Sequence, residues 1–506
     1  MSLRTLVGRV GSAAAIAASP CRRAGLTMPL RAKMLAPLAA PRAQMSTNGV
    51  QGVPKELPTD EPRDVVFSNL YGLRTIELNR PLKYNALNGS MIRKIFPRLV
   101  EWEKSDLANV IVIKGAGDKA FCAGGDVDVL ADQNLLGPDG QRQSVDYFAL
   151  EYQLDHYIAT YQKPYIAFMD GYTLGGGVGL SMHAPFRIAT ERTIFAMPET
   201  TIGFFPDVGA SFFLPRMAGA IGTYLALTSE RVRGVNVFYS GIATHYLHST
   251  SLPGLESRLA ELRFKDYDSM EERLAIIETT IEEYATGLPH GEPLLLGGQL
   301  RDAIDRCFGR NSVEEIIAAL EQEGEPTKDW AQKTLETLHK RSPTSVHVAL
   351  RQMKEGRRWT IAETFSREYQ IAAKFMAHPD FVQGVQAQLS KEDPKPTPKW
   401  EPASLEAIVP GSDIAGPFFQ RTPDLELKLV TDRDYPDYPY QSFGVPTELD
   451  VEMVVRVGGR TRKEVRQHFN KLKQGRQGIS VIVDEILARK TWVDEAGKAV
   501  WNDSNP

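Results

Sequence analysis

The sequence predicts an α/β fold, and two observations support that prediction. Short, continuous apolar runs at 109–114 and 165–169 are typical of buried parallel strands. Segments with apolar residues at helical spacing lie between such runs. Because parallel strands are joined by right-handed crossovers through helices, this alternation indicates an α/β core.

The composition is that of an ordinary globular protein. The 506 residues are 42% apolar and 24% charged, and the net charge of −4 does not mark the whole molecule as a nucleic-acid binder. Three cysteines, Cys21, Cys122 and Cys307, are too few and too scattered for a disulfide framework or a zinc site. No segment reaches the roughly 18 apolar residues of a membrane span, so none is expected.

The first 55 residues are basic and contain no acid, since the first carboxylate is Glu56. They are also rich in alanine and serine. Such a start is typical of a mitochondrial transit peptide, which we assign to residues 1–46, and it predicts a protein of the mitochondrial matrix. A disordered basic tail is the alternative. The basic residues are Arg4, Arg9, Arg22, Arg23, Arg31, Lys33, Arg42 and Lys55.

The first half of the core is expected to begin with two paired strands around a turn at Tyr71 and Gly72. A helix follows, capped by Asn88 or Ser90. A later helix stops before Pro164, because proline disfavours helix at the preceding residue. In order, the expected elements are strands 65–69 and 73–78, a helix with Met91, Ile95, Leu99 and Trp102 on its apolar face, strand 109–114, helix 144–161, strand 165–169, and strands 187–189 and 193–196.

The second half is predicted to be helical. Ser312 and Glu315 have the spacing of a capping box, and further helices are expected at 345–354 and 366–377. A proline-rich and charged stretch at 391–400 predicts a boundary. We therefore expect a core domain at 60–400 and a C-terminal extension at 401–506.

The extension segregates its charge. Eight acids lie in 424–452 with only two bases, whereas 456–476 holds eight bases and Glu464 as its one acid. A helix at 479–489 is expected to close the chain. The eight bases are Arg456, Arg460, Arg462, Lys463, Arg466, Lys471, Lys473 and Arg476.

Two glycine turns and two carboxylates suggest a site for acyl chemistry. Gly175 to Gly177 follow the strand at 165–169, and Gly124-Gly125 follow the strand at 109–114. Glycine leaves its amide open to a ligand, so two such turns can offer convergent N–H groups to one oxygen. Glu199 and Asp207 then follow in mostly apolar surroundings, where a carboxylate has a perturbed pKa.

These motifs resemble the crotonase (enoyl-CoA hydratase/isomerase) superfamily. The segments KAFCAGGD, GGGVGL, FAMPET and FPDVG are similar to those of its 3-hydroxyisobutyryl-CoA hydrolase branch, and the similarity runs from about 65 to about 400. The resemblance implies a spiral of ββα units with a helical C-terminal part, and hydrolysis of 3-hydroxyisobutyryl-CoA in valine degradation without a cofactor or metal.

The resemblance also implies site residues. The N–H groups of Gly125 and Gly176 would hold the thioester oxygen, Glu199 and Asp207 would be the catalytic carboxylates, and Glu151 would contact the acyl-CoA. Residues 83–86 resemble the stretch that lies along the nucleotide of coenzyme A. Glu199 could serve as nucleophile or as general base.

This chain departs from the superfamily at three positions. Gly179 stands where hydratases carry a second catalytic glutamate, which argues against a simple hydratase. Ala210 and Ser211 stand where the hydrolase branch usually has glycines, and tighter packing there would narrow the acyl pocket.

Each assignment has a structural alternative. The glycine run could serve close helix–strand packing, Glu199 could be a surface carboxylate, and Asp207 could cap a helix. Glu151 would lie by default on a solvated helix face. We expect three further residues to be structural, namely Cys122, His183 and His245.

An interaction protein is the second functional hypothesis. Proteins similar to this hydrolase branch also occur in the mitochondrial ribosomal small subunit, and the enzymes end soon after the position of Trp400. The basic residues of 401–506 could neutralise ribosomal RNA phosphates. The same charge run could equally be a solvated face or pair with the acids beside it.

Overall fold

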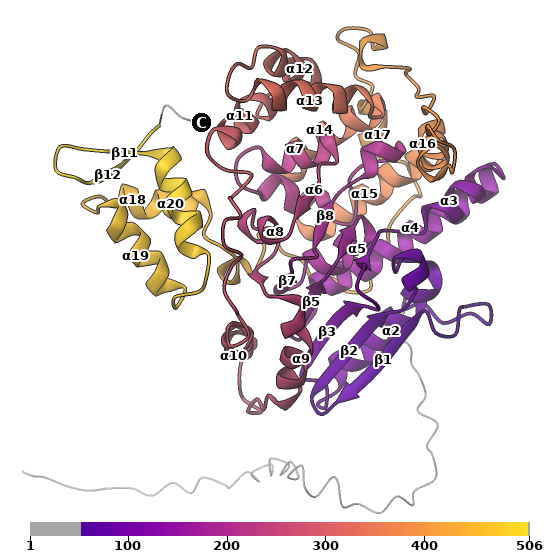
Figure 1. Cartoon of the computed structure of the whole chain (residues 1–506). Helices are drawn as coiled ribbons and strands as arrows, with labels where there is room; N and C mark the ends of the chain where they lie inside the picture. The colour runs from indigo at the N-terminus through magenta and orange to yellow at the C-terminus, as the bar shows by residue number, and fades with distance from the viewer. Residues whose placement is uncertain (1–51, 504–506) are drawn as a thin grey trace, which may run out of the picture. The chain divides into compact units, whose positions relative to one another are not determined.

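A computed structural model describes residues 52–503, and its core is a spiral of two β-sheets wrapped by helices (Figure 1). The predicted transit peptide at 1–46 lies outside the described residues. Within 52–503, no helix is long and apolar enough to cross a membrane. The first sheet has the strand order β1 (Val65–Leu70), β2 (Leu73–Leu78), β3 (Val110–Gly115), β5 (Tyr165–Met169), β7 (Phe186–Ala189) and β10 (His245–Tyr246).

The second sheet takes its strands from between those of the first. Its order is β4 (Ala120–Cys122), β6 (Tyr172–Leu174), β8 (Ile194–Ala196) and β9 (Val232–Arg233). From β3 to β8 the chain visits the two sheets in turn, and neighbours within each sheet are parallel. This alternation produces the predicted spiral of ββα units.

The first sheet follows the sequence pattern closely. β1 and β2 form an antiparallel hairpin, and the turn uses Tyr71 with a φ of 49°. β3 and β5 are buried along most of their lengths, as continuous apolar runs predict. The prediction that the glycine turns directly follow β3 and β5 is wrong, because β4 and β6 intervene. These two strands have only three residues each.

The helices have clear local causes. α2 (Gly89–Lys104) is capped by Asn88, whose side chain accepts a 2.8 Å hydrogen bond from the Met91 amide. α4 (Pro138–Ala159) begins earlier than expected, with proline at its first position. The Ser312 side chain caps the amide of Glu315, but Glu315 bonds the amide of Asn311 rather than that of Ser312.

The remaining helices of the core follow in order. The short ones beside the sheets are α3 (Val127–Asn134), α5 (Gly176–Met182), α6 (Ala210–Phe213), α7 (Ile221–Thr228) and α8 (Val235–Tyr239). The later ones are α9 (Leu252–Glu261), α10 (Met270–Glu282), α11 (Gly298–Phe308), α12 (Val313–Glu321), α13 (Lys328–His339), α14 (Pro343–Gly356), α15 (Ile361–Met376) and α16 (Pro379–Leu389). The predicted helices at 345–354 and 366–377 correspond to α14 and α15.

Residues 420–440 of the extension run as an irregular segment, here called the strap, over α4 and α15. The Arg433 guanidinium donates to both oxygens of Glu103 at 2.7 and 2.9 Å. The backbone carbonyl oxygen of Arg433 lies 3.0 Å from Nε2 of His156. Farther along, the Tyr435 carbonyl accepts from the Ile361 amide at 3.0 Å. The strap therefore ties the start of the extension to the core helices.

The extension ends in a small module. It contains α18 (Glu448–Arg456), α19 (Arg462–Leu472) and α20 (Ile479–Lys490), preceded by the short α17 (Gly416–Phe419). The expectation that a helix closes the chain is wrong, because a hairpin of β11 (Thr491–Val493) and β12 (Ala499–Trp501) follows α20. Figure 1 draws this module in yellow.

Candidate active site

The second sheet brings three segments of the candidate site to one edge. β4, β6 and β8 are parallel neighbours, so their carboxyl ends lie together. Gly125 follows β4, Gly176 follows β6 and Glu199 follows β8. The shared edge is the physical reason why residues up to 74 positions apart in sequence converge.

The two glycine turns face each other closely. A methyl group added to Gly176 would lie 3.3 Å from the amide nitrogen of Gly125 and would collide with Oε1 of Glu151. Among the described residues, neither amide donates a hydrogen bond to a protein acceptor. The arrangement can offer two N–H donors to one oxygen, and glycine at 176 keeps the space open. The packing alternative applies to the next residue, because a methyl group on Gly177 would collide with the Cys122 carbonyl.

Glu199 is buried, as its apolar neighbours predicted. It begins the 3₁₀ turn η2 (Glu199–Ile202), and its side chain is directed at the glycine run, with Oε1 2.9 Å from the position of a methyl group on Gly175. Its Oε2 has no hydrogen-bond partner among the described residues. Burial, and then the charges of Asp207 and Glu151, raise the pKa of Glu199 well above its usual range.

Asp207 contacts a tyrosine rather than capping a helix. The Tyr152 hydroxyl of α4 donates a 2.7 Å hydrogen bond to Oδ2 of Asp207. The capping alternative is not found, because α6 begins after Gly209 and no side chain in the described part of the chain caps it. Burial raises the pKa of Asp207 to about 7, and the Tyr152 hydroxyl opposes that rise.

Glu151 lies inside the molecule, so the solvated-face alternative is wrong. It is only 2% exposed, and its Oε1 has no hydrogen-bond partner among residues 52–503. Burial and the charge of Asp207 raise its pKa well above the usual value. The reason is that α4 is covered on several faces, by α15, α3 and α2 as well as by the strap.

Two further buried carboxyls were not predicted from the sequence. Asp155 lies one helical turn after Glu151, is fully buried, and has two oxygens without a hydrogen-bond partner in the described part of the chain. Its carboxyl fills the space that a side chain at Gly179 would need. The spacing of four residues from Glu151 was the available signal.

Glu368 of α15 is the second of these. It accepts hydrogen bonds from the Gly209 amide at 2.7 Å, from the Ser211 amide at 2.9 Å and from the Ser211 hydroxyl at 2.7 Å. Burial raises its pKa to about 8, although these donors oppose the rise. Ser211, which stands where a glycine was expected, therefore positions the loop that carries Asp207.

Residues 83–86 are tied to the Gly124–Gly125 turn. The Tyr84 carbonyl accepts from the Ala123 amide at 3.0 Å, and Lys83 forms a 3.2 Å ion pair with Asp126. The Lys83 side chain is about half exposed, at 52%. This segment therefore lies beside the proposed oxyanion donors and offers a cation to solvent.

The residues expected to be structural have structural surroundings. Burial raises the pKa of the Cys122 thiol to about 12. Burial lowers the pKa of His183 to about 4, and its Nε2 lies 3.0 Å from the Val208 carbonyl. His245 is buried, and its Nδ1 lies 2.9 Å from the Thr244 hydroxyl.

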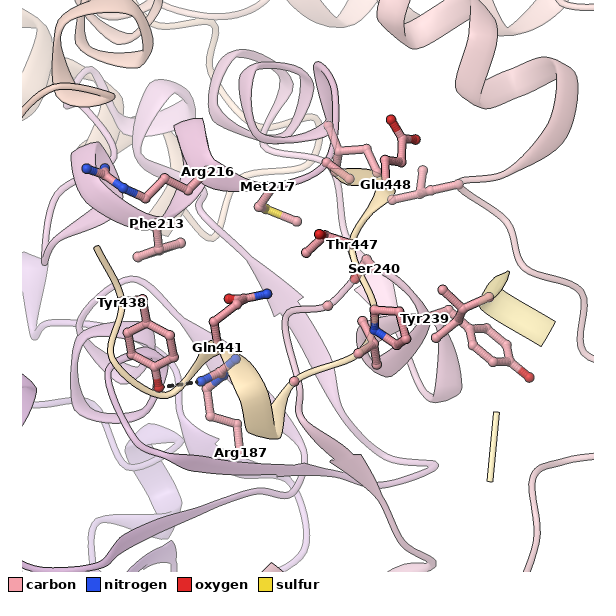
Figure 2. Close-up of a pocket in the computed structure, with 18 of the residues that line it drawn as sticks. Arg187, Phe213, Arg216, Met217, Tyr239, Ser240, Tyr438, Gln441, Thr447 and Glu448 are labelled. Atoms are coloured by element: carbon pink, nitrogen blue, oxygen red, sulfur yellow. Dashed lines mark hydrogen bonds between the residues drawn. The ribbon is translucent and has the colours of Figure 1, made fainter. Parts of the chain in front are cut away.

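A separate cavity of about 130 Å³ lies between the core and the extension (Figure 2). None of the residues discussed above as catalytic or oxyanion candidates lines it. The Arg187 guanidinium borders it and donates a 2.8 Å hydrogen bond to the Tyr438 hydroxyl, the dashed line in Figure 2. This contact joins the extension to β7.

The two-sheet spiral is the crotonase fold. A carnitinyl-CoA dehydratase from Mycobacterium thermoresistibile has 31% sequence identity and a TM-score of 0.61, covering 72% of this chain and 98% of its own. The family model described as enoyl-CoA hydratase/isomerase matches residues 73–416. The chain belongs to the enoyl-CoA hydratase/isomerase family.

Two kinds of relative are similar to this chain. The mitochondrial 3-hydroxyisobutyryl-CoA hydrolase of Gallus gallus is 42% identical over 377 residues, which are 73% of this chain and 94% of that protein. The small ribosomal subunit protein mS47 of Neurospora crassa is 56% identical over 492 residues, which are 96% of each chain. The match to the Neurospora protein is therefore long enough that it must include most of the extension.

Proposed function

We propose that this chain hydrolyses an acyl-CoA thioester in the mitochondrial matrix, with 3-hydroxyisobutyryl-CoA as substrate. The observation that supports this is the shared edge of β4, β6 and β8, where the Gly125 and Gly176 turns face each other and the Glu199 carboxyl is directed at Gly175. The similarity to 3-hydroxyisobutyryl-CoA hydrolases supports the choice of acyl group.

In this proposal the amides of Gly125 and Gly176 hold the thioester oxygen. They stabilise the negative charge of the tetrahedral intermediate, a contribution of about 10²–10³ in rate per donor in known systems. Asp207, held by Tyr152, accepts a hydrogen bond from the 3-hydroxyl of the acyl group or holds a water. Glu151 contacts the acyl-CoA beside Gly176.

Glu199 can act in two ways. As nucleophile, its carboxylate attacks the carbonyl carbon, the C–S bond breaks, CoA thiolate leaves and takes up a proton, and water then hydrolyses the mixed anhydride. As general base, it takes a proton from water while that water attacks the carbonyl. Both routes give the free acid and CoA. A transient acyl adduct on Glu199, sought by rapid quench and intact-mass analysis, distinguishes them.

The test of this function is thiol release from 3-hydroxyisobutyryl-CoA by the purified chain. We expect the wild type to release CoA and Glu199→Gln to lose at least 10³-fold in kcat. Glu336→Gln, at an exposed position of α13, is the matched control and keeps wild-type activity. A wild-type chain without thioesterase activity contradicts the proposal.

We propose a second function, membership of the mitochondrial ribosomal small subunit. The specific observation is the extent of similarity, because the Neurospora ribosomal protein matches 96% of this chain, whereas the Gallus hydrolase matches 73% of it. Gradient sedimentation of a mitochondrial lysate tests it. We expect the full chain in the small-subunit fraction, and a chain lacking 447–506 only among free proteins, with retained thioesterase activity showing that its core is folded.

A further inference from the structure

The terminal module has an inner and an outer apolar face. Val451 and Val455 of α18 and Val465 and Phe469 of α19 are buried and pack within the core of the module. Both helices begin with reciprocal capping boxes, at Thr447 and Thr461. Helices fixed in this way hold their outward side chains in a defined arrangement.

The outer face carries apolar side chains where a surface helix normally has polar ones. Met453 of α18 is 55% exposed, and Val457, the residue that follows α18 one turn later, is 78% exposed. Leu472 at the end of α19 is 61% exposed. Together with Val454 and Phe469 they line one groove of about 850 Å³. The opposite wall is formed by α10 and by residues 441–446. This is a contiguous apolar surface rather than scattered exposure.

Most charged groups of the groove are already paired. Arg476 lies 3.3 Å from Glu278 and donates to the carbonyls of Phe443 and Gly444 at 2.8 Å each. Asp450 is engaged in the Thr447 capping box. Lys473 donates to the Gly444 carbonyl at 2.8 Å. Arg460 donates to the Val454 carbonyl at 3.4 Å and, within residues 52–503, has no ion-pair partner.

Most of the bases that were predicted to bind RNA form hydrogen bonds within the chain instead. Six of the eight contact protein acceptors through their side chains. A nucleic-acid surface needs free cations for phosphates. In this groove, by contrast, Arg460, Lys473 and Arg476 each donate to a backbone carbonyl, beside a mainly apolar wall. The six are Arg456 with Glu452, Arg460 with Val454, Arg462 with Thr491, Arg466 with Asp484, Lys473 with Gly444, and Arg476 with Phe443.

We propose that this groove binds an amphipathic segment of another protein. Its apolar side chains would pack on Met453, Val457 and Leu472, and an acidic side chain would pair with Arg460. Insertion of an amphipathic helix into an apolar groove is a common mode of peptide recognition. That the partner is a protein of the ribosomal small subunit rests on the second proposed function.

Sedimentation of full-length variants in mitochondria that lack the endogenous copy is the first test. We expect the double variant Val457→Glu/Leu472→Glu to be depleted at least tenfold from the small-subunit fraction. Leu449→Glu is the matched control, because Leu449 is 63% exposed on the same helix but does not line the groove. Lys463→Gln/Lys471→Gln removes two exposed bases outside the groove and is expected to leave sedimentation unchanged. Thermal melts check that all variants are folded.

Photo-crosslinking from position 472 of the full-length chain is the second test. We expect an adduct with a different polypeptide, identified by mass spectrometry, that resists nuclease and disappears in the Val457→Glu background. No adduct, a nuclease-sensitive adduct, or a crosslink to the chain itself or to a second copy overturns the proposal.

The two tests separate the groove from the ribosomal function. A wild type in the small-subunit fraction together with a retained Val457→Glu/Leu472→Glu variant overturns the groove proposal and leaves the ribosomal one standing. A wild type absent from that fraction overturns the ribosomal function. In that case, a crosslinked polypeptide that disappears in the Val457→Glu background still supports the proposal that the groove binds another protein.

Discussion

The hydroxyl of Tyr152 donates a 2.7 Å hydrogen bond to Oδ2 of Asp207 and so joins α4 to the loop after Glu199. This hydrogen bond stabilises the charged form of Asp207, whose pKa burial raises to about 7. Removing it in Tyr152→Phe raises the pKa of Asp207 further. The acidic limb of the kcat/KM profile is expected to move to higher pH by on the order of one unit.

Tyr157→Phe is the control for that prediction. In the wild type, the Tyr157 hydroxyl donates a hydrogen bond of the same length, 2.7 Å, but to Glu103 beneath the strap. The pH profile of this variant is expected to match the wild type. An unchanged profile in Tyr152→Phe would show that Asp207 does not titrate in the rate-limiting step.

Gly176→Ala tests the oxyanion geometry. The added methyl group collides with Oε1 of Glu151 and lies 3.3 Å from the Gly125 amide, where the substrate oxygen would bind. Thioesterase kcat is expected to fall by about 10²-fold or more. Gly324→Ala is the control, since no atom of residues 52–503 other than its chain neighbours lies within 4 Å of a methyl group there. Equal activity of the two variants would place the reaction elsewhere.

The buried carboxyls predict that stability falls as pH rises. A carboxyl whose pKa is raised in the folded state contributes stability that is complete below its unfolded pKa and is lost as pH rises through the folded one. For Glu368 this window runs from the ordinary value of 4.5 to about 8. The melting temperature of the wild type is therefore expected to decrease between pH 5 and pH 8.

Asp155→Asn sharpens the same prediction. Burial and the charges of Glu151, Asp207 and Glu368 raise the pKa of Asp155, whose two oxygens lack hydrogen bonds among the described residues. Asparagine cannot ionise, so the variant gains stability relative to the wild type as pH rises from 5 to 8. Denaturant unfolding at pH 5 and 8 measures this. A pH-independent difference would contradict it.

The Arg433–Glu103 pair predicts how firmly the strap is held. Its two hydrogen bonds are partly buried, with Glu103 11% exposed. Arg433→Gln is expected to lower the free energy of unfolding by about 1–3 kcal/mol. The exposed pair of Arg98 and Glu101 provides the comparison, because Arg98→Gln should cost less than about 1 kcal/mol. A double-mutant cycle with Glu103→Gln isolates the pair.

Sequence reasoning recovered the elements with strong local signals. The first sheet was predictable because β3 and β5 are continuous apolar runs, and α2 because Asn88 and the spacing of apolar residues agree. β4 and β6 were missed because three residues carry no period. Their pairing, which places Gly125 beside Gly176, is a long-range property that no local pattern contains.

The candidate site was predictable in part. Its two glycine turns and Glu199 have distinctive neighbours, whereas Asp155 and Glu368 are single carboxylates on helices and by default would face solvent. Their burial depends on how α4 and α15 pack against each other and beneath the strap. The extension was also predictable only in part. Its segregated charge suggested free cations, but in the fold most of these side chains donate hydrogen bonds to protein acceptors.

The contacts of α4 have a consequence for any molecule that binds the extension. Glu151, Tyr152 and Asp155 of α4 belong to or contact the carboxyl cluster, which we define as the buried carboxyl groups of Glu151, Asp155, Glu199, Asp207 and Glu368. On the same helix, the side chains of Gln153 and His156 contact the backbone carbonyls of Lys428 and Arg433 in the strap. A helix moves largely as one rigid rod. A partner that shifts the strap therefore acts on the cluster as well, and thermodynamic reciprocity requires that occupancy of the cluster alter the affinity for that partner by the same factor.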